Sequence, residues 1–311
     1  KSAECKDDPR GRSIATGGFM IERIWPYLSV LCVGSAWGLT IPLTKVIVSD
    51  GYLFFGLIFW QQVICASVLG IVLLVRRQSL TITPGALRLF AIIACVGTIA
   101  PNSASYTAAI HLPAGFLAVI IATVPMFGFP IAVMMGNETF AKFRLLGLFF
   151  GLCGVMLLVL PEARLPDSSK VGFIFLAVIA PLCYGFEGNY VARFGTQNLN
   201  PVATLFGASC LGALATLPFA LLSGHWIDPR LPWGAPDLAL IASATLHAFA
   251  YTSYVWLVKR AGPVFALQVS YAVTIFAVFW AIILLNEQPS LFLWAALSAI
   301  LIGMLLVQPR R

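Results

Sequence analysis

The stretch "VGFIFLAVIAPLCYGFEGNYVARF", residues 171–194, decides the fold class of this chain. It is almost entirely apolar, and an α-helix of that length, rising about 1.5 Å per residue, crosses a hydrocarbon layer of roughly 30 Å. The whole chain has the same character, because 60% of its 311 residues are hydrophobic, 10% are charged and the mean hydropathy is +0.93. Soluble domains of this length are far more charged. The sequence therefore predicts an all-α integral membrane protein.

Segments of this kind recur ten times along the sequence. They cover residues 24–48, 53–75, 86–110, 113–135, 141–160, 171–193, 201–223, 237–258, 263–286 and 291–308. Only His111 and Leu112 separate the third segment from the fourth, so nine spans are the alternative to ten. We predict ten transmembrane helices.

The positive charges predict the orientation of these helices. If the N-terminus is cytoplasmic, ten spans place fifteen of the nineteen Lys and Arg residues on the cytoplasmic side. The four on the other side are Lys45, Arg164, Lys170 and Arg230. Because cytoplasmic loops of membrane proteins are enriched in Lys and Arg, we predict that both termini are cytoplasmic. The net charge of +7 then faces the anionic inner leaflet and calls for no nucleic-acid partner.

The two halves of the sequence repeat each other at a displacement of 145 to 149 residues. The matching positions are Trp37-Gly38 with Tyr184-Gly185, Tyr106-Thr107 with Tyr251-Thr252, Asn137-Glu138 with Asn286-Glu287, and Met156–Val159 with Met304–Val307. The repeat unit is five spans, and an odd number means that the second copy crosses the membrane in the opposite direction. Inverted repeats of this kind are typical of secondary transporters. A duplicated structural protein is the alternative.

This repeat predicts the domain organisation. We expect a cytoplasmic tail at 1–23, a first repeat at 24–160, an outer linker at 161–170, a second repeat at 171–308 and a short cytoplasmic end at 309–311. The tail is polar and mixed in charge, and Met20 is a candidate native start within it.

Several stretches resemble a known family. They include "SAWGLTIPLTKVI" at 35–47, "YTSYVWLVKRAG" at 251–262 and "FAVFWAIILLNEQPS" at 276–290. In these the chain resembles the drug/metabolite transporter superfamily, in its EamA-type branch, across residues 24–308. The resemblance implies two copies of a five-helix unit that carry a small solute across the membrane, with outward transport as the expected direction.

The chain departs from that family pattern at two places. Family members often carry an Arg in the second helix, where this chain has "FWQQV" at 59–63. The Pro of the fourth helix, Pro125, has Thr274 as its counterpart in the ninth. The first departure removes a fixed cation and so argues against a purely anionic cargo.

Glu187 is the acidic residue in the sixth segment that most needs an explanation. Tyr184, Glu187 and Val191 share one helical face, whereas Arg193, six residues further on, points elsewhere. A charge in the hydrocarbon layer is costly, so Glu187 needs a partner from outside its helix. Three alternatives remain: a neutral carboxyl bonded to a neighbouring helix, contact with a cationic solute group, or proton exchange during transport. His247 is the second candidate for proton coupling.

Polar and aromatic residues on other segments are predicted to line one cavity with Glu187. His247, Tyr251 and Tyr254 follow i, i+4, i+7 spacing, so they share a helical stripe. The predicted substrate-binding set is Trp37, Thr40, Gln61, Gln62, Asn102, Tyr106, Tyr184, Glu187, His247, Tyr251, Tyr254, Gln268 and Tyr271. Aromatic rings beside amides and one acid suit a zwitterionic or cationic organic solute. Polar contacts that hold helices together are the alternative role.

Other charged residues and several prolines are predicted to have structural roles. Lys45 lies near the outer end of its segment, where its ammonium group can reach water. Glu138 and Glu287, at helix ends, are predicted to cap helix N-termini. Four prolines are expected to bend helices, as gating hinges or as packing kinks: Pro42, Pro101, Pro125 and Pro130.

The sequence predicts no catalytic residue, metal site or cofactor. It lacks HExxH, GxSxG, paired CxxC and GxxxxGK[ST] motifs. The predicted function is secondary transport of an amino acid, amine or drug-like solute by alternating access, with efflux across a bacterial-type inner membrane by a monomer or weak dimer. The alternatives are uptake or exchange of a vitamin, nucleoside or other metabolite and, more distantly, a membrane receptor or a polytopic membrane enzyme.

Overall fold

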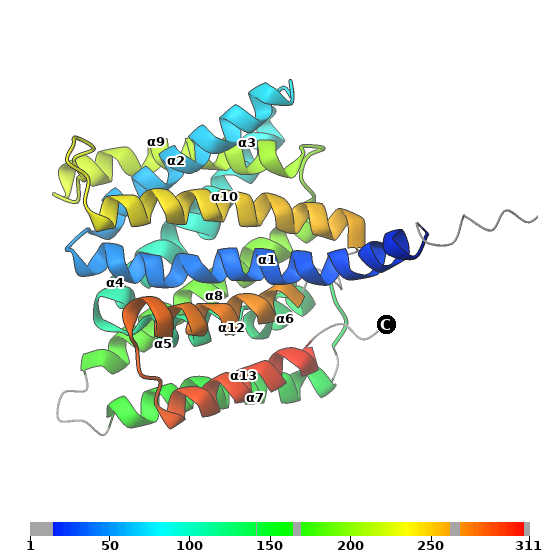
Figure 1. The fold of residues 1–311 in the computed structure, drawn as a ribbon, viewed down its shortest axis with the longest axis vertical. Coiled ribbons are helices and arrows are strands. Elements are labelled where there is room, and N and C mark those ends of the chain that lie inside the picture. Colours follow the sequence, from blue (N-terminus) through cyan, green and yellow to red (C-terminus); the bar gives the residue numbers. More distant parts are fainter. Residues whose placement is uncertain (1–14, 141, 164–168, 262–267, 308–311) are drawn as a thin grey trace, which may run out of the picture.

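The computed structural model describes residues 15–140, 142–163, 169–261 and 268–307, and every regular element in those ranges is a helix. Figure 1 shows the helices lying side by side in one bundle. The elements are α1 (Ala15–Ser49), α2 (Phe54–Val75), α3 (Pro84–Ile92), the π-helix η1 (Ile93–Ile99), α4 (Ala100–His111), α5 (Ala114–Ile121), α6 (Val124–Met134), α7 (Lys142–Ala163), α8 (Ser169–Phe194), α9 (Pro201–Leu222), α10 (Ala235–Ala261), α12 (Gln268–Leu285) and α13 (Leu291–Val307).

The helices confirm the all-α class of the prediction. Eight helical stretches in the described part of the chain are long and apolar enough to cross a membrane. Two shorter apolar helices, Arg144–Val159 and Leu291–Leu306, coincide with the fifth and tenth predicted segments. Ten spans therefore remain a prediction, with a helix present in each predicted segment.

The bundle has two distinct ends. Figure 1 shows the start of α1 and the end of α13 at the same end, which we call the terminal end. The opposite end, called the distal end, holds the α1–α2 turn, the α4–α5 turn and the start of α8.

Two of the predicted spans are interrupted helices. The third predicted span runs as α3, the π-helix η1 and α4, and η1 ends at Ile99, two residues before Pro101 in the first turn of α4. Proline lacks an N–H and cannot continue the preceding hydrogen-bond pattern, which explains a change of helix type at this point. The fourth predicted span is divided into α5 and α6, with Pro125 in the first turn of α6. By contrast, α1 continues unbroken through Pro42.

Each repeat packs its first helix against a helix of the other repeat. Helix α1 packs along α12, and α8 packs along α6. A Cβ atom added at Gly38 would lie 2.8 Å from Val273 O, and one added at Gly185 would lie 2.9 Å from Gly128 N. Because these neighbours are backbone atoms, only glycine allows the helices to approach this closely.

Two charged side chains hold the α4–α5 turn at the distal end. Lys45 Nζ, on α1, donates hydrogen bonds to two carbonyls in the last turn of α4, including Ala109 O at 2.6 Å. Glu287, after α12, accepts from Ala114 N at 2.6 Å and Gly115 N at 3.0 Å in the first turn of α5. A helix carries a partial negative charge at its C-terminus and a partial positive charge at its N-terminus, so a cation at the first and an anion at the second are both stabilising.

The predicted capping role is therefore found at Glu287, although the helix it caps belongs to the first repeat. Glu138, its repeat-related counterpart, pairs with Arg144 at 3.0 Å. The repeat displacement pairs the start of α5 with residues 262–267, which lie outside the described part of the chain, so the cap predicted for Glu138 stays a prediction.

We expect Glu287→Ala to lower the free energy of unfolding by about 2 kcal/mol, because it leaves two amide N–H groups at the start of α5 without an acceptor. Asp228→Ala is the control and should cost much less, because the ion pair that it breaks with Arg230 is exposed. Denaturant unfolding in detergent micelles measures both. Equal losses in the two variants would contradict the assigned cap.

Candidate functional site

A chain of side-chain hydrogen bonds links both repeats near the middle of their helices. Tyr106 OH donates to Gln61 Oε1 at 2.5 Å, and Asn102 Nδ2 donates to the same oxygen at 3.2 Å. Tyr184 OH, from the second repeat, donates to Asn102 Oδ1 at 3.1 Å. The network joins α2, α4 and α8, and all four residues belong to the predicted site. In a membrane interior such bonds satisfy polar groups that lipid cannot.

Glu187 lies one turn beyond Tyr184 on α8 and faces the π-helix η1. A Cβ atom added at Gly97 would lie 2.7 Å from the carboxyl carbon of Glu187, so the absence of a side chain there makes room for the acid. Among the described residues, the carboxylate of Glu187 forms no hydrogen bond and no ion pair. Its side chain is partly accessible rather than sealed. The described helices therefore provide no partner for Glu187.

Aromatic side chains from α1 and α10 form a second part of the site. The ring of Trp37 meets His247 edge to face at 5.8 Å between centroids, and meets Tyr254 at 6.1 Å. Tyr251, one turn after His247, lies within electrostatic range of Glu187. Thr40 donates its hydroxyl to Trp37 O of its own helix at 2.7 Å. This aromatic group, Trp37, His247, Tyr251 and Tyr254, can offer π faces to a cationic or aromatic solute.

Three predicted residues lie apart from these groups. Gln62 packs against Gly212 of α9, away from the network, because adjacent residues of a helix point about 100° apart and Gln61 occupies the inward direction. Gln268 is exposed at the start of α12. Tyr271 packs against the main core, and its buried hydroxyl has no hydrogen-bond partner among the described residues. The prediction placed Gln62 and Gln268 in the cavity, and the structure puts neither there.

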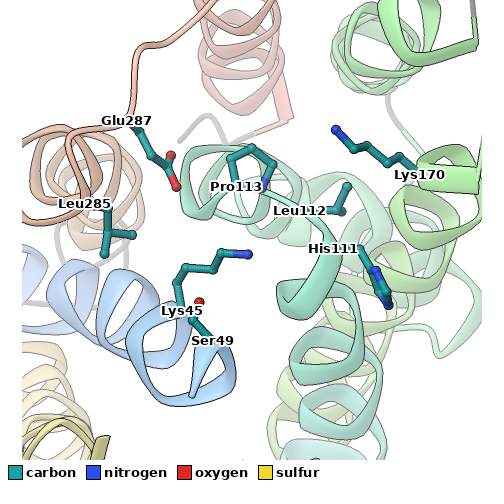
Figure 2. Close-up of a pocket in the computed structure, with 8 residues that line it drawn as sticks. All are labelled: Lys45, Ser49, His111, Leu112, Pro113, Lys170, Leu285 and Glu287. Carbon is teal, nitrogen blue, oxygen red and sulfur yellow. The ribbon is translucent and has the colours of Figure 1, made fainter. Parts of the chain in front are cut away.

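A separate cavity of about 400 Å³ opens at the distal end. Its lining comes from both repeats: Lys45, Ser49, His111, Leu112, Pro113, Lys170, Leu285 and Glu287. In Figure 2, Lys45, Lys170 and Glu287 all extend toward Pro113 in the α4–α5 turn. The sequence did not predict this cavity, because its residues come from the ends of five segments and share no helical face. The positions of the segment ends were the one available signal.

Titratable groups in the connections at the distal end are tied into the fold. Tyr52, between α1 and α2, donates to Asp237 Oδ1 at 2.9 Å, and burial together with this neighbouring carboxylate raises the pKa of Tyr52 to about 12. Asp228, between α9 and α10, bonds the guanidinium of Arg230, which lowers the pKa of that carboxyl to about 2. Within the described ranges, no three His, Cys, Asp or Glu residues gather into a group that could hold a metal ion.

The apolar helices, the inverted repeat and the polar site between the repeats define a multi-pass α-helical membrane protein. A family model described as "EamA-like transporter family" matches residues 24–160 and again residues 172–308. The chain therefore belongs to the EamA-like transporter family, as its motifs indicated.

Two further comparisons found similar proteins. The Escherichia coli K12 protein named "Uncharacterized inner membrane transporter YedA" is 27% identical to the chain over 200 residues, and the same protein of strain O157:H7 matches equally. The match covers 63% of this chain and 62% of YedA, so it spans less than two thirds of that relative. A solved structure titled "Crystal structure of protein" has a TM-score of 0.62 at 20% identity and covers 90% of this chain and 96% of that chain, which shows a shared fold.

We expect Gln61 and Tyr106 to be energetically coupled. Gln61→Leu removes the acceptor of two donors and should lower the free energy of unfolding by about 2 kcal/mol, whereas the double variant with Tyr106→Phe should recover about 1 kcal/mol of that loss. Gln62→Leu, one residue away and outside the network, is the control and should show no coupling with Tyr106→Phe. Reversible unfolding in mixed micelles measures the cycle, and additive losses for Gln61 and Tyr106 would refute the bond.

Proposed function

We propose that this protein is a secondary transporter that moves a small organic metabolite across the membrane by alternating access. The observation that carries the proposal is the partly accessible Glu187 carboxylate, which has no partner among the described residues and lies between the two repeats. In inverted-repeat transporters, the solute and coupling-ion sites lie at mid-depth where the repeats meet. Membership of the EamA-like transporter family supports the same reading.

The chemistry around Glu187 favours a zwitterionic or cationic solute of the amino-acid, amine or drug-like class. A carboxylate attracts an ammonium group, and Trp37, Tyr251 and Tyr254 add π faces nearby. The amide nitrogen of Gln61 donates to no described residue and is free to bind an acceptor on the solute. These groups together bind both a positive and a neutral polar part of one small molecule.

Proton coupling follows from the same carboxylate. A carboxyl group in a membrane interior that lacks a fixed cation is stable only when it is neutralised by a proton or by a bound cation. If a proton and the ammonium group of the solute compete for Glu187, each turn of the cycle exchanges one for the other. His247, packed on Trp37, is the second candidate for passing that proton onward.

The proposed topology has ten spans with both termini in the cytoplasm. The start of α1 and the end of α13 lie at one end of the bundle, and the Lys and Arg distribution supports a cytoplasmic location for that end. The relative YedA is named an inner membrane transporter, which supports the same membrane for this chain. Efflux by a monomer or weak dimer is the favoured mode, and uptake or exchange of a vitamin, nucleoside or other metabolite is the alternative.

The solute can be found by a thermal-shift screen of the purified protein against amino acids, amines, nucleosides and vitamins. We then expect Glu187→Gln to abolish transport driven by a pH gradient in proteoliposomes while leaving solute exchange intact, because an amide cannot release a proton. Glu138→Gln is the control and should keep the wild-type pH dependence. An unchanged pH dependence in Glu187→Gln would refute the proton-coupling role.

A further inference from the structure

Helix α8 is fastened to the other repeat at the terminal end by two asparagines. Asn189 Nδ2 donates to Gly128 O of α6 at 2.9 Å and to Gly185 O of its own helix at 2.8 Å. Asn137, in the turn after α6, donates to Asn189 O at 2.9 Å and to Asn189 Oδ1 at 3.2 Å. These bonds start at the close contact of Gly185 with Gly128 and extend it toward the terminal end.

The repeat-related contact between α1 and α12 has a different side-chain hydrogen bond, from Trp280 Nε1 to Ser35 Oγ at 3.3 Å, and no asparagine at the position that corresponds to Asn189. Gly38 corresponds to Gly185 at the displacement of 147 residues, and the same displacement places Pro42 where the second repeat has Asn189. Proline has no amide side chain, so this contact cannot be extended toward the distal end in the same way. The distal cavity of about 400 Å³ lies on that side, with Ser49 of α1 and Leu285 of α12 in its lining.

The described state therefore has α8 bonded to α6 at the terminal end and a cavity between the repeats at the distal end. Two repeats of similar structure provide two states of similar energy, one facing each side. When two states are that close, a few hydrogen bonds decide which one is populated.

We propose that Asn189 and Asn137 form a latch that holds α8 against α6 at the terminal end, and that transport requires this latch to open. The proposal rests on the proposed transport function and names the contact that controls access to the transport site. Asn189 is suited to reversible opening, because its amide retains the Gly185 carbonyl of its own helix when it leaves Gly128. Glu187 lies two residues before Asn189 on the same helix, so a movement of α8 at Glu187 also moves Asn189.

Two reporter cysteines can measure the state without any solute. Ser49→Cys is exposed and lines the distal cavity, whereas Ala132→Cys is buried on α6, one turn from Gly128 and on the same face. Each is labelled in proteoliposomes with a membrane-impermeant maleimide and compared with the same chain without the reporter, which accounts for the native cysteines.

We expect Asn189→Ala to shift the ratio of Ala132→Cys to Ser49→Cys labelling roughly tenfold toward Ala132→Cys, because the bonds between α6 and α8 are lost. Asn137→Ala should shift the labelling ratio in the same direction. This variant serves as the test if Asn189→Ala does not fold. Gln197→Ala is the control, since this exposed amide at the same end bonds only within its own turn, to Phe194 O. An unchanged ratio in the folded asparagine variants would overturn the latch.

Flux measurements separate this proposal from the proposed function. A shifted labelling ratio in a protein that moves none of the screened solutes would support the latch and count against transport. Solute flux with an unchanged ratio would support transport and reject the latch.

Discussion

The structure depends on the close approach of helices from opposite repeats at two glycines. Gly185 brings α8 onto α6, and Gly38 brings α1 onto α12, at backbone separations that no other residue permits. Because the first helix of each repeat packs against a helix of the other repeat, neither repeat can complete its packing alone. The polar network and Glu187 consequently lie between the repeats.

In surroundings of low dielectric constant, a polar group without a partner costs free energy. Most of the cost is removed by pairing, as when Lys45 and Glu287 bind the two helix ends at the α4–α5 turn. Gln61 similarly satisfies two donors from α4. Glu187 differs from these residues, because its carboxylate, beside the π-helix η1, has no partner among the described helices. A group left unpaired in such a setting is available for a ligand or a proton.

The predicted site illustrates how far helical periodicity reaches. Asn102 and Tyr106 share a face, and so do Tyr184 and Glu187, and the structure brings these pairs together. Periodicity does not say which of two adjacent glutamines points inward, and Gln62 turned out to face α9. It also gave no sign of the π-helix η1, because a π-helix differs from an α-helix by a small change in hydrogen bonding that apolar composition does not record.

The sequence by itself determined the membrane class, the helical segments, the inverted repeat and the family, because these follow from hydrophobic length and from residues repeated along one chain. It also marked Glu187 as an acid without a partner on its own helix. Only the tertiary structure decided that Glu287 caps a helix of the other repeat, that Asn189 fastens α8 to α6, and that the distal end holds a cavity. Each of these joins residues more than fifty positions apart or from several segment ends, and such pairings are set by the packing of whole helices.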